Sequence, residues 1–284
     1  MELGTAFVMG ILLGGLYGLV ALGLSLIFGV VREMNLAHGD FVVLGSYFAY
    51  TIVTACGIDP ILSLALGVPV FLVIGYVLQR FLLNYACRIS HDTVLLVTFG
   101  ISVVLQNVFH ITWGPLSRNL TTPYTLSGLA FGRFHIPLPY LLDFLAAALF
   151  MTALYLFLKH TYLGRAIRAV AQEPTAAQLV GVNVERVHAI TFGIATALCA
   201  VAGVFLGMTF SFTPSTGPAF LIMAFGVVVL GGLGSIVGTL IAGILFGLVQ
   251  TLSGHFFGVV TQTLASYVMA LVVLSIFPKG LFGK

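Results

Sequence analysis

The stretch LGTAFVMGILLGGLYGLVALGLSLIFGVV, residues 3–31, contains no Asp, Glu, Lys or Arg. An α-helix needs about 20 mostly apolar residues to cross the hydrocarbon core of a bilayer. Other uncharged runs cover residues 41–58, 60–79 and 93–117, and a longer one covers residues 187–278. The stretch therefore predicts a first membrane-crossing helix, and the later runs predict several more.

Composition agrees with a membrane protein and excludes an ordinary soluble domain. The 284 residues are 60% hydrophobic and 7% charged, whereas a soluble domain is about 25% charged. The start, MELGTAFVMG, carries Glu2 and no basic residue, so it reads as a spanning helix rather than a cleaved signal peptide. Period-2 alternation typical of barrel strands is missing. We therefore expect an all-α, polytopic membrane helical bundle, because helices satisfy their own backbone groups in lipid.

The apolar runs form a single transmembrane domain, residues 1–284, with about 8–9 spans. We place them near residues 6–31, 40–56, 60–79, 93–113, 137–158 and 189–210, with two or three more in 219–277. With nine crossings, one side receives Arg80, Arg88, Lys159, Arg165, Arg168, Arg186, Lys279 and Lys284. The excess of basic residues makes that side cytoplasmic. The N-terminus is then outside, the C-terminus is cytoplasmic, and Arg118 and Arg133 lie outside. Eight spans with one re-entrant segment remain an alternative.

Glycines spaced four apart recur in the apolar runs, at positions 10, 14 and 18, at 234 and 238, and at 243 and 247. Small residues at this spacing let helix backbones approach closely in lipid. Helix packing is the simpler interpretation, and a hinge or pore lining is the alternative.

The stretch RAVAQEPTAAQLVGVNVERV, residues 168–187, is the main polar interruption. Pro174 suits the first position of a helix, and Gly181 suits the left-handed position after a helix end. Asn183 suits the N-cap of the next span. We therefore expect a helix, a break, a short helix, a second break and a further helix.

A helix of two turns is not stable alone in water, so other contacts must support it. It is either an ordinary loop helix on its own domain or a docking helix for a cytoplasmic partner. In the second case the apolar contacts come from Ala176, Ala177, Leu179 and Val180. Helical spacing places Arg165, Arg168 and Gln172 on one side, where they can meet acidic residues.

Two polar sets lie in or beside spans. Residues at four-residue intervals in the fourth span share one helix face: Thr98, Ser102, Gln106 and His110. At the end of the first span, the sequence REMNLAHGD supplies Arg32, Glu33, Asn35, His38 and Asp40. The first set either hydrogen-bonds between helices or lines a translocation path. The second either anchors the chain at the interface or forms a gate.

Signatures of other functions are missing from the sequence. There is no G-x-x-x-x-G-K-[ST] phosphate-binding loop, HExxH motif or nucleophile elbow. The three cysteines are far apart, and the seven histidines form no ligand-spaced set. Basic residues are scattered rather than gathered into a patch for nucleic acid. We therefore expect no enzyme activity, no metal and no cofactor in this chain.

Four segments carry a family resemblance: GLYGLVALGLSLIFGVVREMNLAHGDFVVLGSY (15–47), LLVTFGISVVLQN (95–107), GRAIRAVAQEPTAAQLVGVNVERV (164–187) and VVVLGGLGSIVGTLIAGILFGLVQTL (227–252). The chain resembles the LivH-type permeases of ABC importers for branched-chain amino acids. The resemblance covers essentially the whole chain. It implies a subunit that forms the translocation path, while partner subunits bind and hydrolyse ATP.

The resemblance also implies that EPTAAQLVG, residues 173–181, docks on an ATP-binding subunit, within a cytoplasmic coupling segment of about 159–188. The residues assigned to docking are Arg165, Arg168, Glu173, Pro174, Ala176, Ala177, Leu179 and Gly181. Pro and Thr follow Glu173, which departs from the strict pattern of such loops.

The implied partners are two ATP-binding cytoplasmic subunits, a second and similar permease, and an extracytoplasmic substrate-binding protein. The loops at 114–139 and 211–218 either meet that protein or are ordinary connecting loops. The implied location is the bacterial inner membrane, and the implied mechanism is alternating access. Leucine, isoleucine and valine are the implied cargo, with urea, short amides or other amino acids as alternatives. A self-sufficient channel or secondary transporter is a rival class, although such proteins more often carry intramembrane acids or arginines.

Overall fold

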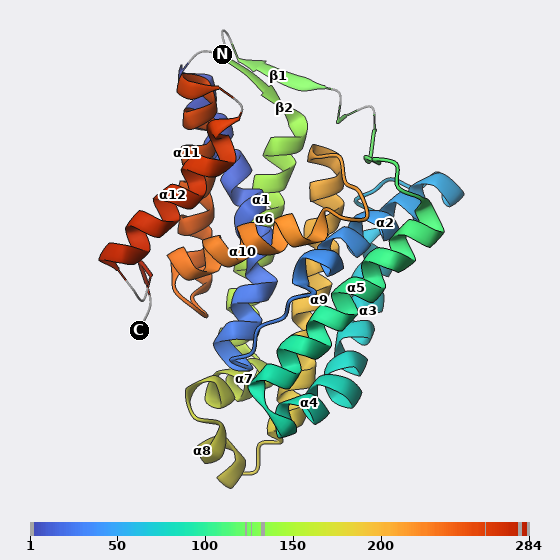
Figure 1. The fold of residues 1–284 in the computed structure, drawn as a ribbon, viewed down its shortest axis with the longest axis vertical. Helices are drawn as coiled ribbons and strands as arrows, with labels where there is room; N and C mark the ends of the chain where they lie inside the picture. Colours follow the sequence, from blue (N-terminus) through green and yellow to red (C-terminus); the bar gives the residue numbers. More distant parts are fainter. Residues whose placement is uncertain are drawn as a thin grey trace.

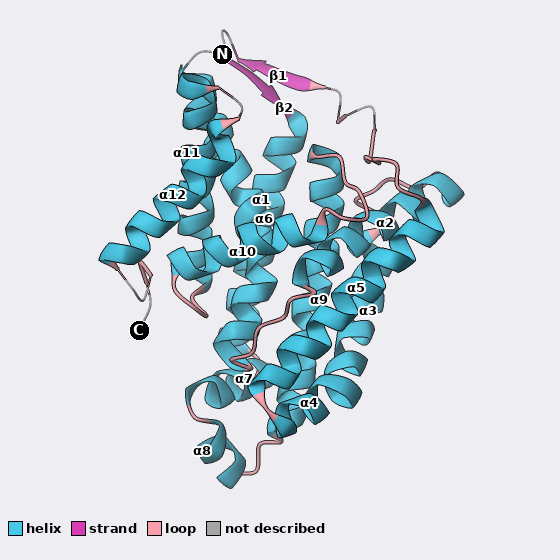
Figure 2. Ribbon diagram, in the orientation of Figure 1, coloured by secondary structure: helices cyan, strands magenta, loops and turns pink. Residues whose placement is uncertain are grey.

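The computed structural model describes residues 3–122, 124–125, 127–131, 134–258, 260–277 and 280–282. It is a helical bundle with one short β-hairpin (Figures 1 and 2). The elements are α1 (Leu3–Val30), α2 (His38–Cys56), α3 (Leu64–Leu78), the π-helix η1 (Gln79–Leu83), α4 (Asn84–Ile89), α5 (His91–Trp113), β1 (Gly128–Phe131), β2 (Phe134–Pro137), α6 (Leu138–His160), α7 (Tyr162–Gln172), α8 (Pro174–Leu179), α9 (Val184–Thr209), α10 (Gly217–Gly231), α11 (Ile236–Phe257) and α12 (Thr261–Ile276).

The predicted spans are confirmed. In the part of the chain that the structure describes, seven helices are long and apolar enough to cross a membrane. One of them is the continuous helix Leu64–Ile89, made by α3, η1 and α4. Two shorter apolar helices, α10 and α12, bring the total to nine. Nine crossings would need both shorter helices to span the membrane, whereas the eight-span alternative has one of the last segments re-entrant.

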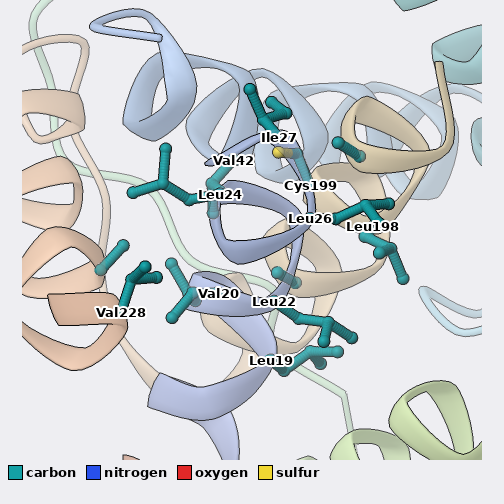
Figure 3. Packing of buried hydrophobic residues seen from close by; sticks show 14 of the residues in the cluster. Leu19, Val20, Leu22, Leu24, Leu26, Ile27, Val42, Leu198, Cys199 and Val228 are labelled. Carbon is teal, nitrogen blue, oxygen red and sulfur yellow. The ribbon is translucent and has the colours of Figure 1, made fainter. Parts of the chain in front are cut away.

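The two most deeply buried helices, α1 and α9, cross at the centre of the bundle. Figure 3 shows leucine and valine side chains of α1 packed near Val42 of α2, Leu198 of α9 and Val228 of α10. The helix α1 is apolar on all sides, as expected of a helix surrounded by other helices. In contrast, α5 leaves most of its length exposed at the edge of the bundle.

The packing repeats in two halves. Helix α1 packs along α11, and helix α9 packs along α3; likewise α2 contacts α9, and α10 contacts α1. Figure 1 shows that α1 and α9 run in opposite directions. The helices α1–α3 and α9–α11 therefore form an inverted repeat, an arrangement that recurs in membrane transporters. We did not predict this repeat from the sequence.

The glycine spacing marks close helix contacts, as its simpler interpretation predicts. A side chain added at Gly14 would place its Cβ 2.6 Å from the carbonyl oxygen of Gly243 on α11. The Cβ of a residue replacing Gly234 would lie 2.7 Å from Cα of Gly29, near the end of α1. Backbones therefore touch where the glycines recur.

Basic side chains gather at the end of the bundle that carries α7 and α8. Arg88 at the end of α4 pairs with Glu185 at the start of α9. Lys159 at the end of α6 accepts a hydrogen bond, through its carbonyl, from Arg168 of α7. Arg118 instead pairs with the chain beyond α9, through the Arg118–Phe212 bridge. Three basic residues used in the orientation argument, Arg133, Lys279 and Lys284, lie outside the described residues.

Candidate functional site

Two helices begin deep inside the bundle. After α1 ends, residues 31–37 run back without helical structure before α2 starts, and residues 210–216 do the same between α9 and α10 (Figure 1). His38 Nε2 lies 2.9 Å from the carbonyl oxygen of Val20. Val20 is ten residues before the end of α1 at Val30, about 15 Å along the helix axis. The N-terminus of α2 is therefore well inside the bundle.

The N-termini of α2 and α10 meet there. A side chain at Gly39 would collide with the carbonyl oxygen of Gly217, and a side chain at Gly217 would collide with the carboxylate of Asp40. We call residues 35–40 and 213–217 the helix junction. Helix N-termini carry partial positive charge, so the junction favours negatively charged groups.

The polar stripe of α5 faces this junction, which joins the two polar sets that the sequence presents separately. Ser102 Oγ donates a 2.5 Å hydrogen bond to Asp40 Oδ2, and Gln106 Nε2 donates to Ser102 Oγ at 3.1 Å. One turn earlier, Thr98 Oγ1 accepts from the backbone N–H of Leu36 at 3.2 Å. His110 continues the stripe but is exposed. Three of the four stripe residues therefore support the junction.

Asn35 and His38 shape the start of α2. Asn35 Oδ1 accepts from the backbone N–H of Ala37 at 3.1 Å, which closes a tight turn before the helix. His38 is completely buried and contacts α9 as well as α1, because its Nδ1 lies 3.5 Å from Cys199 Sγ. His38 therefore joins three helices at one point, which is consistent with a structural role.

Two polar atoms of the junction are buried without a hydrogen-bond partner among the described residues. They are Oδ1 of Asp40 and Nδ2 of Asn35. Most buried polar atoms in folded proteins have partners. The described part of the chain therefore leaves one acceptor and one donor at the junction unused.

A small apolar pocket adjoins the junction. Its volume is about 250 Å³, and it is lined by Asn35 together with apolar residues of α1 and α10, among them Leu24, Phe28, Ile222 and Phe225. Ligand pockets in proteins combine such apolar walls with a few placed polar groups. The surface of this pocket is apolar, and its polar neighbour is the adjoining junction.

Sequence reasoning missed another buried carboxylate, Asp143 in α6. Its side chain is fully buried and accepts a 2.7 Å hydrogen bond from Thr209 Oγ1 at the end of α9. An acidic residue inside an apolar span is uncommon and often functional. The single Asp143 in this span could therefore have been recognised from the sequence as a candidate functional residue. Its contact with α9 could not be read from the sequence.

At the basic end, the predicted break pattern is confirmed. Pro174 begins α8, Gly181 has φ +88°, and Asn183 Oδ1 accepts from the backbone N–H of Arg186 at 2.9 Å as the N-cap of α9. Glu173 is the N-cap of α8, and hydrogen bonds from the side chain and backbone of Thr175 lower the pKa of its carboxyl. Local sequence therefore fixes both ends of this short helix.

The exposed apolar residues at α8 match the predicted docking face except at one position. Leu179 is 89% exposed and Val180 is 79% exposed, and Ala176 is exposed as well. Ala177 is buried, and its carbonyl accepts from the N–H of Val182 as the chain turns back towards α9. The exposed apolar surface of α8 therefore consists of Ala176 and Leu179, together with Val180 at the C-cap, and does not include Ala177.

The end of α7 connects to the helix junction through residues 31–37. Arg32 has a left-handed backbone, with φ +60°, and its guanidinium donates to the carbonyl oxygens of Ala171 at 3.1 Å and Gln172 at 3.4 Å. The next residue, Glu33, lies 2.6 Å from His91 at the start of α5. Partial burial raises the pKa of Glu33, and the contact with His91 opposes that effect. The end of α7 is thus tied directly to the segment that leads to Asp40.

Comparison with known proteins identifies the family. The family described as branched-chain amino acid transport system / permease component matches residues 6–277. The high-affinity branched-chain amino acid transport system permease protein LivH of Escherichia coli K12 is 32% identical over 290 residues, which cover 97% of this chain and 94% of LivH. The corresponding BraD of Pseudomonas aeruginosa has the same identity and coverage. Among solved structures, PsaBC from Streptococcus pneumoniae in complex with Fab has a similar fold, with a TM-score of 0.52 and 15% identity over 98% of this chain and 93% of that chain. The chain therefore belongs to the family of branched-chain amino acid transport permeases.

Proposed function

We propose that this chain is one of two similar permease subunits in an ATP-driven importer for leucine, isoleucine and valine in the bacterial inner membrane. In this arrangement α7 and α8 lie on the cytoplasmic side, the N-terminus lies outside, and two ATP-binding subunits supply the energy. An extracytoplasmic binding protein delivers the cargo to the loops at 114–139 and 211–218. The chain itself carries no ATPase chemistry.

The exposed apolar surface of α8 is the observation that carries this proposal. A six-residue helix has little stability of its own, yet it presents Leu179 and Val180 almost fully to the surroundings at the basic end. An exposed apolar patch with charged neighbours is typical of a protein interaction site. Arg165, Arg168 and Glu173 are exposed nearby. A groove on one ATP-binding subunit would cover these apolar side chains in helix-in-groove fashion.

Movement of α8 has a direct route to the helix junction. The route runs from α7 through the Arg32 hydrogen bonds to residues 31–37, and from there to Asp40. A rigid-body shift of α7 and α8 that follows ATP binding would move the start of α2 relative to α10. Alternating access then opens the junction to one side of the membrane at a time.

The junction offers complementary groups for an amino acid. The N-termini of α2 and α10 favour a carboxylate, and the free oxygen of Asp40 favours an ammonium group. The neighbouring pocket presents apolar walls to an aliphatic side chain. Urea and short amides lack such a side chain, so the pocket favours branched-chain amino acids over these alternatives.

The decisive experiment replaces Leu179 with Ser. The variant should reduce co-purification with the ATP-binding subunits and reduce uptake of labelled leucine at least several-fold, because the docking surface loses its largest apolar side chain. Leu62→Ser is the matched control, since Leu62 is also 66% exposed but lies on the connection between α2 and α3. It should assemble and transport normally.

Normal assembly and uptake by Leu179→Ser would refute docking through α8. Leucine movement in liposomes that contain this chain alone, without nucleotide, would instead favour the rival channel or secondary-transporter class.

A further inference from the structure

We propose that the cavity between α6, α7 and the turn from α10 to α11 binds the headgroup of an anionic phospholipid from the cytoplasmic leaflet. The cavity has a volume of about 540 Å³. It is separate from the helix junction and from the exposed surface of α8. The inference adopts the orientation given under Proposed function but does not depend on the cargo or on ATP.

Two cations face this cavity. Lys159, from the end of α6, and Arg168, from the middle of α7, both line it and are both exposed. Arg168 Nη2 donates to the carbonyl oxygen of Lys159 at 3.4 Å, which holds the two residues together. Lys159 Nζ lies 5.7 Å from the ring centre of Tyr155. None of the described lining residues is acidic, so the positive charge in the cavity is not neutralised by its own walls.

The rest of the wall is mainly apolar. Leu158 of α6 lines the cavity together with Phe282 and with Leu233, Ile236 and Val237 from the α10–α11 turn and the start of α11. The backbone bond from Leu281 N–H to the carbonyl oxygen of Leu230, 2.8 Å long, holds that last segment in place. A cavity with cations at one part and aliphatic side chains at another matches a phosphate headgroup joined to acyl chains.

The depth of the cavity also fits a lipid. Gly234, in its wall, packs against Gly29, one residue before α1 ends at Val30. The cavity therefore lies at the level where the spans finish, which is where phosphate groups of the leaflet lie. Basic pockets between transmembrane helices at the cytoplasmic interface are known to hold anionic lipid headgroups. Arg guanidinium groups suit phosphate oxygens because they donate two parallel hydrogen bonds.

Such a lipid would join the coupling segment to the second half of the inverted repeat. Arg168 belongs to α7, whereas Ser235 and Ile236 begin α11, which packs along α1. A bound headgroup would therefore stabilise the position of α7 relative to the bundle.

Native mass spectrometry of the full-length chain in detergent, titrated with phosphatidylglycerol or with phosphatidylcholine, tests the proposal. Phosphatidylglycerol should bind more tightly. Lys159→Gln and Arg168→Gln should each lower its affinity about five-fold, the effect of one basic residue near an anionic surface. Arg165→Gln is the matched control, because Arg165 lies on the same helix but does not line the cavity, and it should bind normally. Val237→Trp should also lower affinity, because it fills the cavity without changing charge.

Equal affinity for the two lipids, or equal losses in Arg165→Gln and Lys159→Gln, would overturn the proposal. Inorganic phosphate at millimolar concentration distinguishes the source of the anion. If phosphate does not displace phosphatidylglycerol, the bound anion is the lipid headgroup. If phosphate binds alone and displaces phosphatidylglycerol completely, the proposal is refuted. Because the measurement needs neither ATPase nor cargo, failure of the proposed importer function would leave this result unchanged.

Discussion

At the scale of single residues, Asp40 is one of two buried aspartates in the part of the chain that the structure describes. A buried carboxylate is unfavourable unless hydrogen bonds or positive charge compensate for lost hydration. Ser102 supplies one hydrogen bond, and the N-termini of α2 and α10 supply partial positive charge. Gly39 and Gly217 permit this arrangement, because a side chain at either position would push the two helices apart.

Asp40→Asn tests whether this carboxylate contributes to transport. The substitution keeps the size of the side chain but removes the negative charge that we propose to bind the ammonium group of the cargo. Uptake of leucine should fall at least ten-fold, with a raised KM, while protein level and assembly with the ATP-binding subunits stay unchanged. Asp92→Asn is the control, because Asp92 is exposed in the first turn of α5. Normal uptake by Asp40→Asn would assign the carboxylate to packing alone.

At the scale of elements, residues 31–37 are the link between α7 and α2. This segment is not helical, so its position depends on side-chain contacts at both ends. Arg32 holds one end to the last carbonyls of α7, and Thr98 holds the other through the N–H of Leu36. The guanidinium also places positive charge at the C-terminus of α7, where the helix dipole favours it.

Arg32→Gln should uncouple the two ends of this segment. The glutamine side chain is uncharged and too short to donate hydrogen bonds to both carbonyl oxygens of α7. ATP hydrolysis by the assembled transporter should continue, whereas leucine uptake per ATP hydrolysed should fall several-fold. Both rates are measured in the same proteoliposomes. Arg80→Gln, an exposed substitution in η1 at the same end, should leave the ratio unchanged. An unchanged ratio for Arg32→Gln would contradict the proposed route.

At the scale of the whole molecule, the inverted repeat places the buried N-termini of α2 and α10 face to face. Helices α1 and α9, which run in opposite directions, pack against α10 and α2. Helix α11 packs along α1, and helix α3 packs along α9. The two ends of the bundle therefore differ: one carries α7, α8 and most of the basic side chains, while the other carries the β-hairpin (Figure 1).

Cysteine labelling tests this orientation. Cys56 is exposed where α2 ends, whereas Cys199 is buried. A membrane-impermeant maleimide should label Cys56 in right-side-out vesicles. A Leu179→Cys substitution, made together with Cys56→Ser and Cys87→Ser, should be labelled only in inside-out vesicles. The reverse pattern would place α8 outside and would be incompatible with docking on cytoplasmic subunits.

The sequence by itself determined the features that depend on neighbouring residues. Spans follow from the length of apolar runs, because backbone groups in lipid must bond within the helix. The ends of α8 and the start of α9 follow from Pro174, Gly181 and Asn183, because capping is a local interaction. The four-residue spacing also showed that Thr98, Ser102 and Gln106 share one face of α5.

Only the tertiary structure decided what each face meets. Ser102 and Asp40 are 62 positions apart, and the partners Thr209 and Asp143 are separated by 66. Helical periodicity gives the direction of a side chain within its own helix, but not the helix that packs against it. Ala177 turned inward for the same reason, because the chain after α8 folds back towards α9. The meeting of Gly39 with Gly217 likewise depends on the packing of the two halves, which no local pattern specifies.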